Sequence, residues 1–170
     1  MMNGIEICKP PTKPNFKDTA PRIFLAGSIE MGAAVNWQDR VVNNLISANE
    51  KYPLPYEVRI FNPRRDDWDN SWEQKIENKQ FREQVEWELD ALENCSLVAM
   101  YFDPATKSPI SLLEFGLFAR LSHPQLVVCC PEGFWRKGNI DIVCNKFEVA
   151  QVPTLDELIK VCVRHATNYP

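Results

Sequence analysis

A single acidic residue, Glu114, stands among apolar side chains in the stretch FDPATKSPISLLEFG, which covers residues 102–116. Its neighbours include Leu112, Leu113 and Phe115, and the pattern predicts that it falls in or near the first turn of a helix. There the helix dipole would stabilise a carboxylate by about 0.3–1 kcal/mol, which is the simplest explanation for the residue. Carboxylates are, however, rarely buried without a partner or a task. An ionised carboxylate at the rim of a crevice could attack carbon, so Glu114 is the candidate nucleophile.

The segment NPRRDDWDNSW, residues 62–72, has the most unusual composition in the chain, with arginines, aspartates and tryptophans close together. An aromatic plate beside an arginine fork suits a planar heterocycle, a sugar or a phosphate. The same composition also fits a surface loop fixed by exposed ion pairs, which contribute little stability. We favour the binding interpretation, for which the candidate residues are Asn62, Arg64, Arg65, Asp67 and Trp68.

Three shorter loops also carry polar residues at the ends of apolar runs. Gly27 and Ser28 could bring a backbone amide and a hydroxyl group close to a ligand, although a tight turn alone also explains the glycine. Asp103 ends another apolar run, and Ser108 comes just before the helix of Glu114. The last of these loops, residues 131–139, ends in Asn139 and either covers the crevice, reaches into a neighbouring subunit or is a plain surface loop.

Strand and helix patterns alternate along the chain. Short β-branched or aromatic runs bounded by Gly, Pro or Asp predict strands at residues 22–27, 56–61, 96–102 and 125–130, with a short fifth strand within 146–151. Helical periodicity predicts helices at residues 36–49, 81–95, 111–121 and 154–166. In the second of these helices, the predicted buried face consists of Phe81, Val85, Leu89 and Leu92.

This alternation predicts the fold class. Nearly continuous hydrophobic strands between amphipathic helices indicate an α/β domain with a five-stranded parallel sheet, doubly wound as in Rossmann or flavodoxin-like folds and flanked by helices. In such sheets ligands bind beyond the carboxyl ends of the strands. The polar loops are therefore expected around one crevice.

The composition narrows the classes of protein that the chain can belong to. Its 170 residues are 45% hydrophobic with a net charge of −4, which suits one globular domain and gives no general attraction to nucleic acid or to an anionic membrane. No apolar run approaches the roughly 20 residues of a membrane span. Residues 1–20 are interpreted as an N-terminal arm, mobile or wrapped on the surface, and residues 21–170 as the domain.

The cysteines predict neither a metal site nor a disulfide framework. No pair among the six has C-x-x-C spacing, and the chain has only two histidines. Cys129 and Cys130 lie in an expected strand, where a free cysteine behaves as a small hydrophobe. Reduced cysteines and the lack of a signal-peptide pattern predict a cytoplasmic protein.

Several segments together resemble the nucleoside 2-deoxyribosyltransferase family and its nucleotide N-glycosidase relatives. They are IFLAGSI, NPRRDDW, VEWELDALENCSLVAMYF and SPISLLEFGLFA, and the likeness extends from about residue 22 to about residue 145. The family's nucleophile is the Glu of an E-x-G-x-A signature. This Glu matches Glu114 of EFGLFA, where one extra residue precedes the Ala. The resemblance therefore implies an α/β enzyme with Glu114 as its nucleophile.

The resemblance also implies further site residues. An acidic residue that lines the family's site matches Glu88, and an Asn that an adjacent subunit often donates matches Asn139. Two positions depart from the transferases: Ser108 stands where they commonly have an Asp, and Phe24 stands where they have a tyrosine that can orient the nucleophile. Relatives that hydrolyse deoxynucleoside 5′-monophosphates have Ser at the first of these positions and a similar GSI turn. In that case Ser28 and Ser108 would hold a phosphate.

The implied reaction cleaves the N-glycosidic bond of a 2′-deoxynucleoside through a covalent intermediate on Glu114 and passes the sugar to another base. The departing base needs a proton, and the candidate donors, in falling order, are Asp103, Asp67 and Glu88. Trp68 would stack on the base. Two alternatives stay open, namely hydrolysis of nucleoside 5′-monophosphates and a non-catalytic nucleotide-binding module.

The implied partners are small molecules and further copies of the chain. A nucleoside or nucleotide and a free base are the expected ligands, with no nucleic acid polymer and no membrane. The chemistry requires no metal and no organic cofactor. Because the family shares active sites between subunits, the resemblance implies a homodimer or a higher homo-oligomer.

Overall fold

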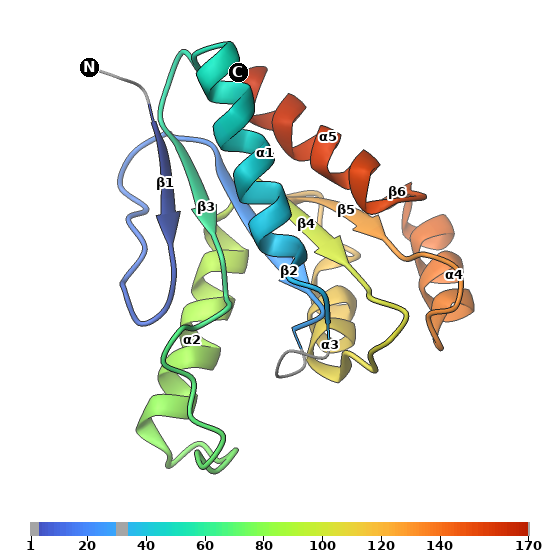
Figure 1. The fold of residues 1–170 in the computed structure, drawn as a ribbon. Helices are drawn as coiled ribbons and strands as arrows, with labels where there is room; N and C mark the ends of the chain where they lie inside the picture. Colours follow the sequence, from blue (N-terminus) through green and yellow to red (C-terminus); the bar gives the residue numbers. More distant parts are fainter. Residues whose placement is uncertain (1–3, 30–33, 170) are drawn as a thin grey trace.

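Six parallel strands form one sheet in the part of the chain that the computed structural model describes, residues 4–29 and 34–169 (Figure 1). The strands are β1 (Ile5–Cys8), β2 (Arg22–Gly27), β3 (Val58–Phe61), β4 (Leu97–Tyr101), β5 (Gln125–Cys129) and β6 (Ala150–Val152). The helices are α1 (Trp37–Lys51), α2 (Lys79–Asn94), α3 (Pro109–Phe118), α4 (Lys137–Phe147) and α5 (Leu155–Thr167).

The expected strands are confirmed as β2 to β6. Almost every residue of β2, β3, β4 and β5 is buried, because helices cover both faces of the sheet. Such strands read as continuous apolar runs, which is why the sequence reveals them. The strand expected within residues 146–151 is shorter and starts later, since α4 occupies the segment up to Phe147.

The predicted count of five strands is wrong, because residues of the N-terminal arm form a sixth strand. β1 pairs in parallel with β3 along its whole length, from Ile5 beside Val58 to Cys8 beside Phe61. It is short, lies at the edge of the sheet and buries only Cys8 fully. A half-exposed edge strand of this kind lacks the apolar run that marks the central strands.

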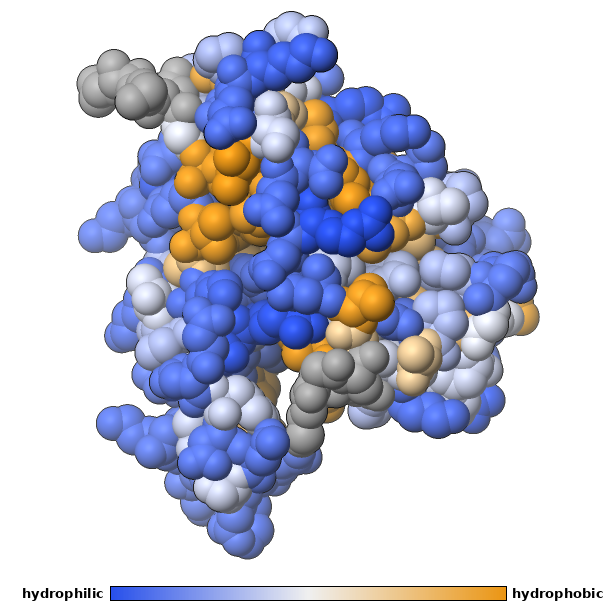
Figure 2. Space-filling view, in the orientation of Figure 1, coloured by the Kyte–Doolittle hydropathy of each residue, from blue (hydrophilic) through white to orange (hydrophobic). Residues whose placement is uncertain are grey.

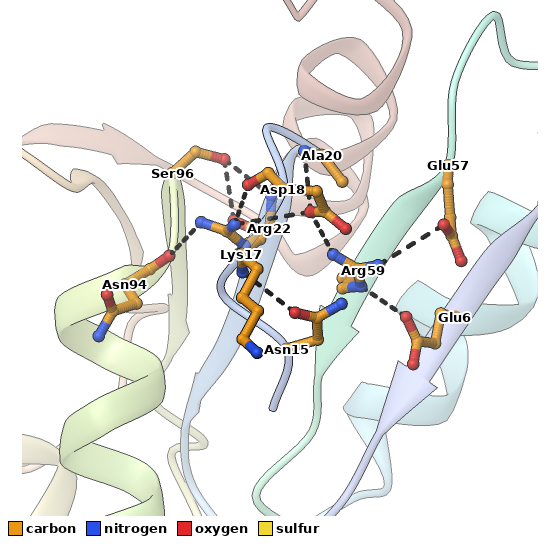
Figure 3. Close-up of polar contacts among 10 residues, drawn as sticks. All are labelled: Glu6, Asn15, Lys17, Asp18, Ala20, Arg22, Glu57, Arg59, Asn94 and Ser96. Atoms are coloured by element: carbon orange, nitrogen blue, oxygen red, sulfur yellow. Dashed lines mark hydrogen bonds and ion pairs between the residues drawn. The ribbon is translucent and has the colours of Figure 1, made fainter. Parts of the chain in front are cut away.

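A buried arginine attaches the N-terminal segment to the sheet. Arg59 of β3 is 5% exposed and pairs with Glu6 of β1, at 2.5 Å between Nε and Oε2, and with Asp18 (Figure 3). Glu57 lies 3.6 Å from the same guanidinium group. The hydrogen bond to Asp18 raises the pKa of Arg59, and the same bond lowers the pKa of Asp18. This cluster therefore holds together segments that are distant in the sequence.

Replacing Arg59 with Met is expected to destabilise the protein by about 1–3 kcal/mol, less than for a fully buried ion pair because the carboxylates are partly exposed. Urea unfolding at pH 7 measures this. Arg82→Met is the control, because Arg82 is exposed and lies 3.7 Å from its partner Glu86. Since Arg59 lowers the pKa of Asp18, the difference between Arg59→Met and wild type should shrink as the pH falls and Asp18 is protonated. Equal losses in both variants would contradict the assigned role.

Helices cover both faces of the sheet, and the loops that follow the strands lie at the carboxyl ends of the strands. α1 and α5 contribute to one core cluster, and α2, α3 and α4 to the other (Figure 1). In the strand order β1-β3-β2-β4-β5-β6, β2 lies between β3 and β4. The chain therefore passes from β2 to β3 on one side of β2, and then to β4 on the other side of β2. The loops after β2, β3 and β4 therefore meet at the same end of the sheet, where parallel α/β proteins bind ligands.

Two helices differ from the sequence-based expectation. α4 begins within the segment expected to be a loop, and its helical periodicity is weak because its buried residues are only Ile140 and Cys144. In α2, Val85 and Leu89 are 37% and 38% exposed, so the predicted buried face is wrong in part. Trp87 fills the core instead, which turns Val85 and Leu89 outward.

The described residues show no feature of a membrane span or a metal site. No helix in residues 4–29 and 34–169 is long and apolar enough to cross a membrane. The same residues contain no group of three His, Cys, Asp or Glu side chains arranged to hold a metal ion. All six cysteines are buried with free thiols, and burial raises the pKa of Cys129 and of Cys130 to about 12, so these two thiols stay protonated at neutral pH.

Candidate active site

Glu114 lies on the buried side of α3, together with Ser111, Phe115 and Phe118. The residue is 8% exposed, and its carboxyl group makes no hydrogen bond to any other residue that the structure describes. Because α3 begins at Pro109, Glu114 belongs to the second turn rather than the expected first turn. The helix dipole acts mainly within the first turn, so it does not explain why this carboxyl is buried.

Glu88 of α2 supplies a second carboxyl group beside Glu114. Burial raises the pKa of both carboxyl groups, and the negative charge of Glu88 raises the pKa of Glu114 further. Two carboxylates that repel each other in a buried site tend to share one proton. This pair therefore keeps a proton at pH values where ordinary carboxyl groups have lost theirs. Such an arrangement can provide a nucleophile and an acid at the same time.

Gln84 connects Glu88 to the loop that follows β3. Its amide nitrogen donates to Glu88 Oε1 at 2.6 Å and to the backbone oxygen of Pro63 at 3.0 Å. The residue is 4% exposed, and its own Oε1 is buried without a hydrogen-bond partner among the described residues. The bond to Gln84 opposes the effect of burial on the pKa of Glu88.

Three buried hydroxyl groups gather in front of α3. Ser28 Oγ and Ser108 Oγ are 2.6 Å apart, and Thr106 Oγ1 lies 2.7 Å from Ser108 Oγ and 3.0 Å from Ser28 Oγ. Ser108 adopts the left-handed backbone conformation, with φ at 47° and ψ at 52°. This conformation costs a residue other than glycine about 1–3 kcal/mol, and it persists only where the surroundings enforce it. The hydroxyl cluster is part of those surroundings.

Asp103 holds two of the loops together. Its carboxylate accepts from the backbone N–H of Val35 at 3.0 Å and from that of Ala105 at 2.9 Å, while its own N–H donates to Ser28 Oγ at 2.8 Å. Each carboxylate oxygen is thus engaged by one backbone donor. This geometry suits a structural anchor between the loops after β2 and β4 better than a proton donor.

Gly27 is required by the packing of β2 against β4. Its φ is 132°, and a Cβ atom added to it would lie 2.1 Å from the backbone oxygen of Tyr101. That backbone atom cannot move away without disrupting the sheet, where Ser28 N donates to the same oxygen at 2.9 Å. The tight-turn explanation is therefore sufficient for Gly27, and no ligand contact is needed to account for it.

In the loop after β3, Arg65 stabilises the aromatic residues. Its side chain is 5% exposed, with Nε 2.7 Å from Asp67 Oδ1 and the guanidinium carbon 4.8 Å from the centre of the Trp72 ring. Trp68 packs edge-on against Trp72 at 5.2 Å. The bond to Arg65 lowers the pKa of Asp67, whose side chain is exposed, so Asp67 is poorly suited to donate a proton.

Arg64 and Asn62 stand where β3 ends. Asn62 is 1% exposed, and its Oδ1 accepts from the backbone N–H of Arg64 at 3.0 Å. The Arg64 atoms Nε and Nη2 are buried without a hydrogen-bond partner among the described residues. Unpaired buried donors are costly, which makes Arg64 the best candidate in this loop for binding a polar or anionic group. Figure 2 shows a hollow in the surface above the lowest part of the molecule, where Figure 1 places the loop after β3 and the start of α2.

Asn139 is not joined to these residues within one chain. It is exposed in the first turn of α4, and its backbone N–H donates to Arg136 O at 3.0 Å. The preceding loop does reach the site, because Trp135 Nε1 donates to the backbone oxygen of Lys107 at 3.0 Å. The ring of Trp135 is flanked by Arg136 at 4.2 Å and by Lys107 at 4.8 Å.

The structure thus brings together two groups of candidate residues and adds two that the sequence did not reveal. Glu88 and Glu114 form one group, and Ser28, Asp103 and Ser108 form the other. Gln84 and Thr106 are the additions. The spacing of Gln84, one helical turn before Glu88, is a signal that could have identified it.

Comparison with models of protein families gives a match. A family model described as nucleoside 2-deoxyribosyltransferase like matches residues 20–134, which is more than half of the chain. The matched range includes both groups of candidate residues. No curated protein matches the sequence.

Proposed function

Because the chain belongs to the nucleoside 2-deoxyribosyltransferase-like family, we propose that it is a pentosyltransferase that cleaves the N-glycosidic bond of 2′-deoxynucleosides and passes the sugar to another base. The observation that carries this proposal is the pair of neighbouring carboxyl groups, the half-buried Glu88 and the buried Glu114, whose pKa values are both raised. Retaining enzymes that cleave glycosidic bonds use such a pair as nucleophile and acid.

In the first step an oxygen of the Glu114 carboxylate attacks C1′ of the sugar. The bond between C1′ and the base nitrogen breaks, and its electron pair goes to the base, which takes a proton from Glu88. In the second step a nitrogen of the incoming base attacks C1′, the ester to Glu114 breaks, and the proton released by that base returns to Glu88. The products are a new nucleoside and an unchanged enzyme.

Glu88 is the proton donor in this proposal, ahead of Asp103 and Asp67. Asp103 is engaged by two backbone donors, and Asp67 is held ionised by Arg65. The pKa of Glu88, by contrast, is raised by burial, which keeps the proton available at a higher pH. In the substrate-binding loop, Trp68 stacks on the base, and Asn62 and Arg64 contact its polar edge.

The test combines base exchange with trapping of the intermediate. A 2′-deoxynucleoside is incubated with a second free base, and chromatography is expected to show a new nucleoside. A 2-fluorinated deoxynucleoside analogue is then expected to leave a sugar adduct on Glu114, detected by peptide mass spectrometry. Turnover without any adduct would exclude the covalent route, and no turnover with any nucleoside or nucleotide would exclude the enzyme proposal.

A second candidate function is hydrolysis of deoxynucleoside 5′-monophosphates. It is favoured by the buried hydroxyl cluster in front of α3 and by the unpaired donors of Arg64, since hydroxyl and guanidinium groups bind phosphate. Free base and sugar phosphate from the monophosphate alone, without a new nucleoside, would support it. The non-catalytic alternative requires nucleotide binding that survives Glu114→Ala, with no turnover by the wild type.

An apolar stripe on α3 supports a homo-oligomer. Ile110 and Leu113 are 59% exposed, and Leu117 and Leu121 are 51% exposed. The first three recur at helical spacing on one face, and Val85 and Leu89 of α2, a helix on the same side of the sheet, are also exposed. An exposed apolar stripe such as Ile110, Leu113 and Leu117 on α3 is typical of an interface.

Replacing both Leu113 and Leu117 with Glu is therefore expected to convert the oligomer into monomers. Burying these charges in an interface would cost more than the contact contributes. Sedimentation velocity measures the change. Tyr52→Glu is the control, because Tyr52 is 67% exposed at the end of α1, on the other side of the sheet. A wild type that is monomeric at high concentration would contradict the oligomer.

A further inference from the structure

Resting on the proposed function, we infer that Gln84 is a positioning residue that fixes which oxygen of Glu88 carries the proton for the leaving base. Gln84 is buried on α2, one helical turn before Glu88, and it touches neither the sugar nor the base in this proposal. It acts through Glu88 and through the loop that begins at Asn62.

The orientation of the Gln84 amide follows from the chemistry of its neighbours. Its nitrogen lies 3.0 Å from the backbone oxygen of Pro63, and a carbonyl oxygen can only accept. The opposite orientation would place two carbonyl oxygens against each other. The amide nitrogen must therefore face Pro63, and its other hydrogen points to Glu88 Oε1 at 2.6 Å.

Both hydrogens of the amide are thus committed. The remaining atom, Gln84 Oε1, stays buried without a partner among the described residues. A buried acceptor without a partner is unfavourable, and this one is tolerated because the two donor contacts determine the orientation. The amide is held rigidly between the loop after β3 and the carboxyl pair.

This arrangement determines the state of Glu88. Since Oε1 receives a hydrogen from Gln84, a proton on Oε1 would face another donor, so the proton of Glu88 belongs on Oε2. Burial raises the pKa of Glu88, and the hydrogen bond from Gln84 opposes this effect, while the charge of Glu88 raises the pKa of Glu114, the titratable group that faces it from α3. By stabilising the ionised form, Gln84 makes Glu88 a stronger acid than its burial alone would allow. Gln84 therefore sets both the direction and the ease of proton release.

The test uses Gln84→Met, which keeps the length of the side chain but removes both donors. Gln80→Met is the matched control, because Gln80 is exposed on the same helix. In protein labelled with ¹³C at the glutamate carboxyl carbon, with Glu88→Gln for assignment, the Glu88 signal is expected to titrate about one pH unit higher in Gln84→Met. Gln80→Met should titrate as wild type does. This measurement requires no turnover, so it separates failure of this inference from failure of the proposed function.

Activity provides a second readout. In Gln84→Met, kcat is expected to fall roughly tenfold, and the alkaline limb of its pH profile should move upward with the titration of Glu88. A merely structural role would lower activity equally at every pH.

If Gln84→Met does not fold, the wild type alone decides. The side-chain amide signals of Gln84 in a ¹H–¹⁵N spectrum are expected to shift over the same pH range as Glu88. Amide signals that stay constant while Glu88 titrates would overturn the inference. So would identical titrations in Gln84→Met and Gln80→Met.

Discussion

Base exchange by Glu114→Gln is expected to be at least about 10⁴-fold slower than by the wild type, because an amide cannot form the glycosyl bond. Gln has nearly the shape of Glu, and position 114 makes no hydrogen bond to another described residue that the change would break. The variant should therefore fold and bind the nucleoside. Initial rates of new nucleoside formation, followed by chromatography, measure the loss.

The control for this variant is Glu93→Gln, an exposed position on α2. It should exchange bases at the wild-type rate. Residual activity of Glu114→Gln above about one tenth of wild type would show that another group attacks C1′. In that case the fluorinated analogue should label a different residue, which peptide mass spectrometry would identify.

Glu88→Gln is expected to lower kcat roughly 10²- to 10⁴-fold, the contribution usual for a general acid. The reaction needs an ionised Glu114 and a protonated Glu88, which is the less populated of the two singly protonated forms because the pKa of Glu114 is raised more than that of Glu88. The rate of the wild type should therefore rise and then fall with pH. The apparent pKa values of both limbs of the pH–rate profile should be higher than those of ordinary carboxyl groups, because burial raises the pKa of Glu88 and of Glu114. The variant should keep the acid limb and lose the alkaline limb, since it has no acid left to deprotonate.

The same substitution is expected to stabilise the fold at high pH. Because the pKa values are raised in the folded state, the folded protein binds more protons than the unfolded chain between the ordinary carboxyl range and the raised values. The free energy of unfolding of the wild type therefore falls as the pH rises through this window. Glu88→Gln removes one of the two charges, so above the window it should be more stable by about 1–3 kcal/mol. At pH 4, where both carboxyl groups are protonated, the two proteins should be nearly equally stable.

Urea unfolding at pH 4 and at pH 9 tests this expectation. Glu83→Gln, an exposed change on the same helix, is the control and should follow the wild type at both values. A Glu88→Gln variant that is less stable than wild type at pH 9 would mean that the Glu88 carboxylate has a stabilising partner. The interpretation of the two residues as a repelling pair would then be wrong.

The sheet could be predicted from the sequence as far as local patterns define it. β4 and β5 are continuous apolar runs, because helices cover both of their faces. β1 could not be predicted, since it buries only Cys8 fully and owes its place to pairing with β3 and to the ion pairs of Arg59. α4 has few buried residues, so its periodicity is weak.

The candidate site divides in the same way. Glu114 could be identified as a candidate from the sequence, because a single acidic residue in an apolar segment is unusual. The order of the candidate proton donors cannot be derived from the sequence, because it depends on contacts between distant segments. Asp103 accepts from Val35 and Ala105, Asp67 pairs with Arg65, and only Glu88 is left with a raised pKa.

The sequence by itself determined the α/β class, the central strands and the choice of Glu114 as a candidate residue. Burial and periodicity determine the pattern of apolar and polar residues within a segment, so these features can be read locally. Only the tertiary structure decided that Glu114 has Glu88 beside it, that Gln84 links Glu88 to Pro63, and that Gly27 is required by Tyr101. Each of these depends on the approach of segments far apart in the chain. Pairwise charge and hydrogen-bond interactions act through space over a few ångströms, so they appear only when the helices and loops are in place.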